Sequence, residues 1–188
     1  MGQRLVINVY EHDSDPDPLL NVYYHWSAYS TTSLMEAANF LESYNEIEHT
    51  EVKIIDLIQA FEELGARVSN ADDVVYIDDT YGYETNPIGI NRNNGLIACT
   101  EKTMAKSISY AEGVIDIYID DGYLNSNCFY VWYREDLEDE EQIVKARENL
   151  ESIRFDRLDF VIMFLINAVA DGVNVMEVEG NQLLGLIE

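Results

Sequence analysis

The spacing of apolar residues along the chain predicts both strands and helices. Leu5, Ile7 and Val9 alternate with Val6, Asn8 and Tyr10, and a second apolar run at 19–24 follows an acidic stretch at 11–18 that contains two prolines. Alternation with a period of two is typical of a half-buried strand, and the turn residues between the two runs predict a β-hairpin. Further strands are expected at 74–77, 114–120, 128–133, 173–178 and 182–187.

Apolar residues at helical spacing predict about four helices. Ser33 and Glu36 form a capping-box pattern at the start of the first. The acids at 135–141 suit the start of the third, because carboxylates stabilise the positive N-terminal end of a helix. The expected helical ranges are 32–45, 50–65, 143–150 and 156–170.

These elements indicate an α+β fold with an antiparallel sheet. The chain has 188 residues, the size of one ordinary domain, and it contains neither an internal repeat nor a linker rich in Gly, Ser or Pro. We therefore expect a single domain over 1–188. The most apolar run, 160–170, is 11 residues long, whereas a membrane-spanning helix needs about 20. No membrane association is expected.

The charge of the chain limits the kinds of molecule that it can bind. Its 36 acidic and 11 basic residues give a formal net charge of −25 at pH 7. Affinity for a nucleic-acid backbone comes mainly from Lys and Arg that displace counterions, so direct binding of free nucleic acid is not expected. An acidic protein is attracted instead to basic surfaces, including the grooves in which other proteins hold DNA or RNA. Alternatively, the negative charge serves only to keep the protein soluble.

The candidate binding surface consists of clustered carboxylates with tyrosines between them. Tyr123 lies beside two of these acids and could act as an aromatic anchor of the kind found at interface hot spots. Carboxylates at such spacings can imitate a phosphate backbone, and a solvated acidic surface is the alternative reading. The predicted binding residues are Asp120, Asp121, Tyr123, Glu135, Asp136, Glu138, Asp139, Glu140 and Glu141, together with the loop at 13–17.

The sequence contains candidate catalytic residues but no recognisable catalytic motif. His25 lies among tyrosines and serines and could act as a general acid or base, and Arg92 stands in an Asn-rich turn suited to a phosphate. Asp116 and Asp120 could hold Mg²⁺ if the protein were a nuclease. The two cysteines, Cys99 and Cys128, have no zinc-site spacing. We expect a binding protein rather than an enzyme, and no resident metal or cofactor.

Four segments resemble a family of small proteins from phages and plasmids of Gram-positive bacteria. They are the N-terminal residues Met1–Leu5, the block NVYYHWSAYS at 21–30, NRNNGLI at 91–97 and AEGVIDI at 111–117. The similarity around them is patchy and covers about a third of the chain, concentrated before residue 35 and between residues 91 and 119. Proteins of this context resemble the type II anti-CRISPR group, many of which are small, acidic and directed at Cas9 or its guide RNA.

The resemblance implies an inhibitor of a nucleic-acid-directed defence nuclease. The expected partner is Cas9 or the Cas9–guide RNA complex, whose positive channels an acidic domain can occupy. A ribonuclease that trims guide RNA together with Cas9 is one alternative, and a phage accessory protein with no defence target is another. The expected location is the cytoplasm of the bacterial host cell, and the Tyr-rich strands could also form a homodimer edge.

Overall fold

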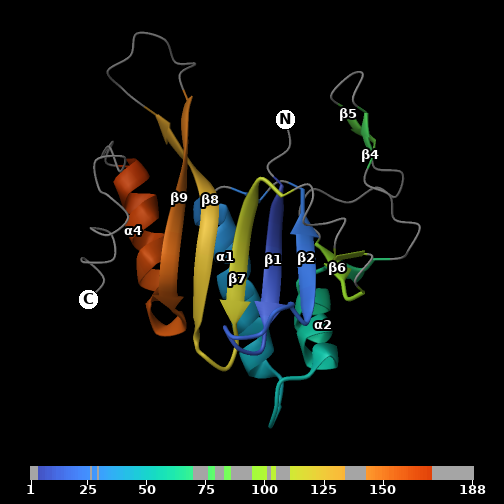
Figure 1. Cartoon of the computed structure of the whole chain (residues 1–188). Coiled ribbons are helices and arrows are strands. Elements are labelled where there is room, and N and C mark those ends of the chain that lie inside the picture. The colour runs from blue at the N-terminus through green and yellow to red at the C-terminus, as the bar shows by residue number, and fades with distance from the viewer. Residues whose placement is uncertain are drawn as a thin grey trace.

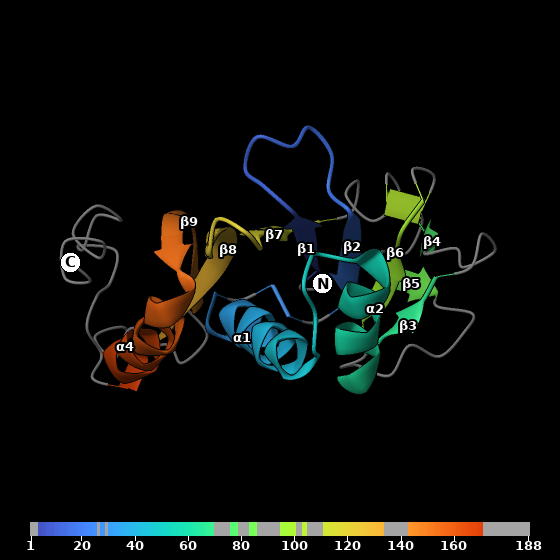
Figure 2. The ribbon, with the colours of Figure 1, turned by 90° about the horizontal axis from the view of Figure 1, so that it is seen from below.

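The fold is a mixed seven-stranded sheet with helices packed on one face (Figures 1 and 2). The computed structural model describes residues 4–25, 27–28, 30–69, 76–78, 83–85, 95–100, 103–104, 111–133 and 143–170. The strand order of the main sheet is β3-β6-β2-β1-β7-β8-β9, and β4 and β5 form a separate two-stranded sheet. The strands are β1 (Leu5–Tyr10), β2 (Leu20–Tyr24), β3 (Arg67–Val68), β4 (Tyr76–Asp78), β5 (Tyr83–Thr85), β6 (Leu96–Ala98), β7 (Gly113–Tyr118), β8 (Tyr123–Tyr133) and β9 (Ile143–Arg154).

The predicted N-terminal hairpin is confirmed, because β1 and β2 pair antiparallel with Leu5 opposite Tyr24. The prediction of a purely antiparallel sheet is wrong. β1 pairs parallel with β7 along its other edge, and β3 pairs parallel with β6. Parallel neighbours need a long connection, and the chain between β1 and β7 provides one, since it contains two helices and several strands before it returns beside β1.

The expected number of helices is also wrong for the part of the chain that the structure describes. It contains three α-helices, α1 (Ser30–Glu46), α2 (Ile54–Glu63) and α4 (Leu158–Ala170), and a single 3₁₀ turn at Phe155–Arg157. The predicted helix at 143–150 is strand β9, which pairs antiparallel with β8 from Ile143 opposite Tyr133 to Arg154 opposite Tyr123. Pairing along a whole strand outweighs the weak helical preference of this segment.

The ranges of the other helices agree with their patterns, but the predicted capping box is wrong, because α1 begins at Ser30 and Ser33 lies inside it. Glu36 accepts a hydrogen bond from the hydroxyl of Ser27 instead. Helix α2 begins after Lys53 rather than at Thr50, and Gly65 just beyond its end has a φ of 90°, as a helix-terminating glycine should. No described helix is both long and apolar enough to cross a lipid bilayer.

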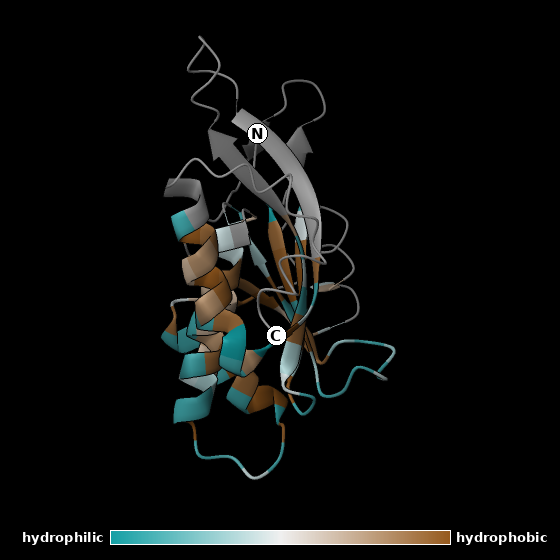
Figure 3. Cartoon of the chain, turned by 90° about the vertical axis from the view of Figure 1, so that its left-hand side faces the viewer, coloured by the Kyte–Doolittle hydropathy of each residue, from teal (hydrophilic) through white to brown (hydrophobic). Residues whose placement is uncertain are grey.

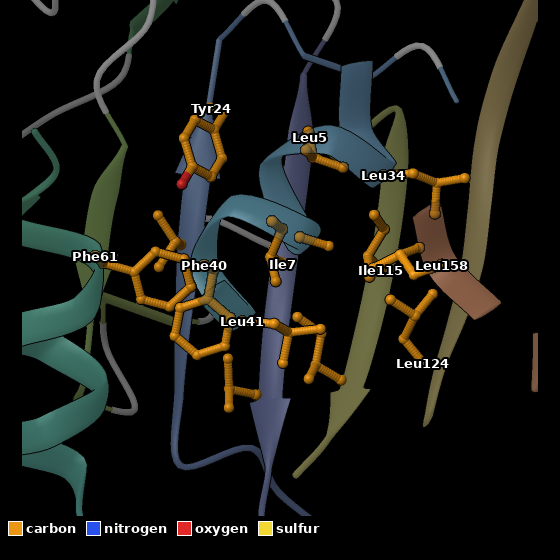
Figure 4. Close-up of a cluster of buried hydrophobic side chains, with 14 of the residues drawn as sticks. Leu5, Ile7, Tyr24, Leu34, Phe40, Leu41, Phe61, Ile115, Leu124 and Leu158 are labelled. Atoms are coloured by element: carbon orange, nitrogen blue, oxygen red, sulfur yellow. The ribbon is translucent and has the colours of Figure 1, made fainter. Parts of the chain in front are cut away.

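The main core lies between the sheet and the helices (Figures 3 and 4). Leu5, Ile7 and Val9 of β1 point to this side and are fully buried. They pack with Ile115 and Ile117 of β7 against apolar residues of the three helices, and burial of this apolar surface provides the main stabilisation of the fold. The helical residues of the core are Leu34, Ala37, Phe40, Leu41, Tyr44, Leu57, Ala60, Phe61, Leu158, Val161, Ile162 and Leu165.

The turn between β7 and β8 is tighter than the sequence suggests. β7 ends at Tyr118 and β8 begins at Tyr123, so residues 123–127, which read as a loop, are strand. Gly122 in this turn has a φ of 71°, a left-handed conformation that residues with a Cβ adopt at a cost.

Replacing Gly122 by alanine should therefore destabilise the turn. We expect the Gly122→Ala substitution to lower the free energy of unfolding by about 1 kcal/mol, because the added Cβ disfavours the left-handed backbone. Urea unfolding followed by circular dichroism measures the change. Arg154 Nη2 would lie 3.5 Å from the new Cβ, an ordinary contact, so a loss several times larger would contradict a purely conformational cause.

Candidate functional site

Two acidic segments that are far apart in the sequence meet at one end of the sheet. The loop between β1 and β2 projects on the side of the sheet away from the helices (Figure 2) and lies against the turn between β7 and β8. Parallel pairing of β1 with β7 brings them together, and backbone hydrogen bonds from Ile119 N to Tyr10 O (3.1 Å) and from Asp120 N to Glu11 O (3.0 Å) extend this pairing. We call the resulting surface the acidic edge, defined by Glu11, Asp13, Asp15, Asp17, Asp120 and Asp121.

Side chains of the acidic edge hold the two segments in place. The backbone N–H of Asp13 donates to Asp121 Oδ2 at 2.7 Å, and the hydroxyl of Tyr123 donates to Asp13 Oδ2 at 3.0 Å. Within the first loop, the N–H of His12 donates to Asp15 Oδ2 at 2.9 Å. These bonds use some carboxylate oxygens for structure, and they fix the positions of the charges that face solvent.

Two basic groups lie close to these carboxylates. His12 Nε2 is 3.7 Å from Asp120 Oδ2, and Arg154 Nη1 donates to the backbone oxygen of Asp121 at 3.3 Å. The acidic edge has six carboxylates and only these two basic groups beside them, so its surface remains negatively charged.

A metal-binding donor set lies within the acidic edge. Glu11, His12 and Asp120 each offer one ligand atom, and these atoms lie within 4.8 Å of one another. Two carboxylates with one imidazole suit Zn²⁺ or Mn²⁺. His12 and Asp120 are solvent-exposed and Glu11 is half-buried, so these side chains are also well hydrated without an ion.

A row of three tyrosines continues from the acidic edge onto the sheet. Tyr10 and Tyr118 are opposite each other in the β1–β7 pairing, with ring centroids 5.2 Å apart, and Tyr118 and Tyr123 are 4.9 Å apart. Burial, followed by the nearby Asp116 carboxylate, raises the pKa of Tyr10 to about 12. Burial and the hydrogen bond to Asp13 raise the pKa of Tyr123 to about 12. Both hydroxyls therefore stay protonated at neutral pH and can donate hydrogen bonds.

Beyond the tyrosines, a polar row crosses the middle of the same face. Asn8 of β1 is opposite Asn21 of β2 on one side and Asp116 of β7 on the other, and Asp116 is opposite Asn125 of β8. Asn8 Nδ2 donates to Asp116 Oδ1 at 2.8 Å. Burial raises the pKa of Asp116 above its usual range, and the hydrogen bond from Asn8 opposes this shift in part.

The predicted catalytic residues do not come together as one site. His25 follows the Tyr24 end of β2, opposite Leu5, whereas Asp120 follows the Tyr10 end. At about 3.3 Å per residue, these ends of β1 are roughly 17 Å apart. The hydroxyl of Tyr23 lies 3.0 Å from His25 Nδ1, so His25 has a partner on its own segment. Arg92 lies outside the described residues.

The structure describes only some of the predicted binding residues. Asp120, Asp121 and Tyr123 belong to the acidic edge or border it, as does the loop at 13–17. The acids Glu135, Asp136, Glu138, Asp139, Glu140 and Glu141 lie outside the described residues. Their described neighbours, Tyr133 and Ile143, pair at the end of the β8–β9 hairpin opposite to Tyr123.

Sequence reasoning missed Glu11, His12, Asn8 and Asn21. The first two become neighbours of Asp120 only through the parallel pairing of β1 with β7. For the asparagines a signal existed, because each interrupts an otherwise apolar strand. A polar residue at such a position must find a partner or a ligand.

Comparisons with protein-family models, with curated proteins and with solved structures give no match for this chain.

Proposed function

We propose that this protein is a stoichiometric inhibitor that binds a basic groove of a nucleic-acid-directed nuclease of the Cas9 class through its acidic edge. The main support for the proposal is that hydrogen bonds join the β1–β2 loop to the β7–β8 turn. Asp13 takes part in two of them, one with Asp121 and one with Tyr123. The resemblance to type II anti-CRISPR proteins supplies the class of target.

The physical basis is complementarity of charge. A surface with several fixed carboxylates is attracted to the Lys- and Arg-lined channel that holds guide RNA and target DNA, and the net charge of −25 accelerates encounter with it. Tyr123 adds an aromatic group at the border of the charged surface. Aromatic residues are enriched at the centres of protein interfaces.

Incubation with a Cas9–guide RNA complex tests the proposal and separates it from its rivals. The protein is added below and above equimolar ratio, with Mg²⁺ present, and both guide RNA length on a denaturing gel and cleavage of target DNA are measured. We expect intact RNA and a loss of DNA cleavage only at equimolar protein or above. A parallel binding assay in EDTA removes any metal held by Glu11, His12 and Asp120, and we expect binding there to persist.

Two outcomes would contradict the proposal. Shortened RNA at substoichiometric protein would identify a guide-RNA-trimming ribonuclease. Unchanged RNA and unchanged DNA cleavage at excess protein, with no complex formed, would favour an accessory protein with another role.

A further inference from the structure

Three side chains that can bind a metal come from two distant segments and meet at the acidic edge. Glu11 and His12 begin the loop after β1, and Asp120 lies in the turn after β7 (Figure 1). One ligand atom from each lies within 4.8 Å of the other two, and His12 Nε2 is 3.7 Å from Asp120 Oδ2. Within the described ranges, no other three His, Cys, Asp or Glu side chains come so close together. This group therefore differs from the many carboxylates that surround it.

The backbone fixes the positions of these three residues. The N–H of Asp120 donates to the backbone oxygen of Glu11 at 3.0 Å, and the N–H of His12 donates to Asp15 Oδ2 at 2.9 Å. The parallel pairing of β1 with β7 ends directly beside them. Ligands on a fixed backbone lose less conformational freedom when an ion binds, so the donor set is preorganised.

An ion can reach these side chains from solvent. The side chains of His12 and Asp120 are 47% and 46% exposed, and Glu11 is half-buried. Zinc lies about 2.0–2.2 Å from its nitrogen and oxygen ligands, which places tetrahedral ligands roughly 3.4 Å from one another. Small rotations of the exposed side chains are therefore enough to bring the three atoms around one ion.

A buried hydroxyl without a partner lies near the same carboxylates. Tyr44 of α1 is 2% exposed, and its hydroxyl oxygen is buried without a hydrogen bond among the described residues. Burial raises the pKa of Tyr44, and the charges of Asp56, Asp120 and Glu11 raise it further, so these carboxylates are close enough to act on the hydroxyl. Glu11 also continues the alternation that places Val9 in the same core as Tyr44. Because carboxylates that bind a metal are usually oriented by a second donor, Tyr44 supports the assignment of Glu11 as a ligand.

We infer that Glu11, His12 and Asp120 form a binding site for one Zn²⁺ ion. Three protein ligands from imidazole and carboxylate groups, with water at a fourth position, are a known zinc arrangement. Ca²⁺ takes about six to eight oxygen ligands, and Mg²⁺ keeps much of its water and binds to carboxylates and phosphates, so a site with an imidazole suits neither.

The ion connects the β1–β2 loop to the β7–β8 turn and so braces the acidic edge. This inference goes beyond the proposed function. Hydrogen bonds already join the two segments, so binding to the partner does not require the ion.

Calorimetric titration of the metal-free protein with Zn²⁺ tests the site without any protein partner. We expect one ion per chain at the tightest site. His12→Gln and Asp120→Asn should each weaken this binding at least tenfold, because each removes one of the three ligands. The matched control His49→Gln removes another exposed imidazole, which lies outside the donor set, and should change the affinity less than twofold.

Thermal unfolding with and without Zn²⁺ provides a second readout. An ion that binds only the folded protein stabilises it, so saturating Zn²⁺ should raise the melting temperature of the wild type and of His49→Gln. His12→Gln should melt like the metal-free wild type and gain nothing from Zn²⁺. If His12→Gln fails to fold, Asp120→Asn decides, since it replaces a different exposed ligand.

The inference is overturned if His12→Gln and His49→Gln weaken Zn²⁺ binding equally. It is also overturned if several ions bind each chain with similar affinity, as in diffuse attraction to an acidic surface, or if an equal concentration of Ca²⁺ displaces the Zn²⁺. These measurements use the protein alone, so failure here and failure of the proposed function are distinguishable.

Discussion

Replacing Phe40 by alanine is expected to lower the free energy of unfolding by about 3–5 kcal/mol, as for other buried Phe→Ala changes. The Phe40 side chain is 0% exposed at the centre of the helix–sheet core, and its ring is stacked on Phe61 with centroids 4.0 Å apart and an interplanar angle of 8° (Figure 4). Removing it leaves a cavity between α1 and α2. Since domains of this kind are stable by about 5–15 kcal/mol, the variant should lose a large fraction of its stability.

Urea unfolding measures this loss, and Phe160→Ala is the matched control. Phe160 is on α4 and is 51% exposed, so the same chemical change should cost about 0.5 kcal/mol or less. Equal effects of the two substitutions would mean that the core does not lie between the sheet and the helices.

Reversing three charges of the acidic edge is expected to weaken binding to the Cas9–guide RNA complex by more than tenfold. We choose Glu11→Lys, Asp17→Lys and Asp120→Lys, because in the described part of the chain these side chains accept none of the hydrogen bonds that hold the two loops together. The loss should appear mostly in the association rate, which depends on steering by charge. The dependence of affinity on salt should also become weaker.

The control is the triple variant Glu42→Lys, Glu48→Lys and Glu62→Lys, at exposed positions on or beside the helices. Each reversal adds two charges, so three of them change the net charge from −25 to −19 in both variants. Surface plasmon resonance at several salt concentrations compares the two. If the control weakens binding as much as the edge variant, overall charge would explain the interaction and the acidic edge would not.

Local patterns predicted the strands and helices whose burial follows a simple period. β7 alternates between buried and half-buried residues, and α1 and α4 bury residues at helical spacing, so these patterns identify them without tertiary information. β1 and β2 are buried along their whole length, and it is their short apolar runs with turn residues between them that identify the hairpin. β9 could not be found in this way, because Ile143, Val144 and Leu150 have no strand alternation. Its conformation is decided by pairing with β8.

Only separate parts of the candidate site could be predicted from the sequence. The acids at 13–17 and at Asp120 and Asp121 were visible as charge clusters, but Asp13 and Asp121 are 108 residues apart and meet only through a parallel strand pair. A sequence pattern does not specify which strands become neighbours across so long a connection. The polar row of Asn8, Asn21 and Asp116 depends on the same register.

Hydrogen–deuterium exchange of this protein, alone and with excess Cas9–guide RNA complex, tests the central claim most directly. Exchange reports protection segment by segment, so it shows which face the partner covers. We predict slower exchange in the acidic loop at 11–18 and in the turn at 119–123, with helices α2 and α4 unchanged. Protection confined to the helices, with none at the acidic edge, would contradict the account.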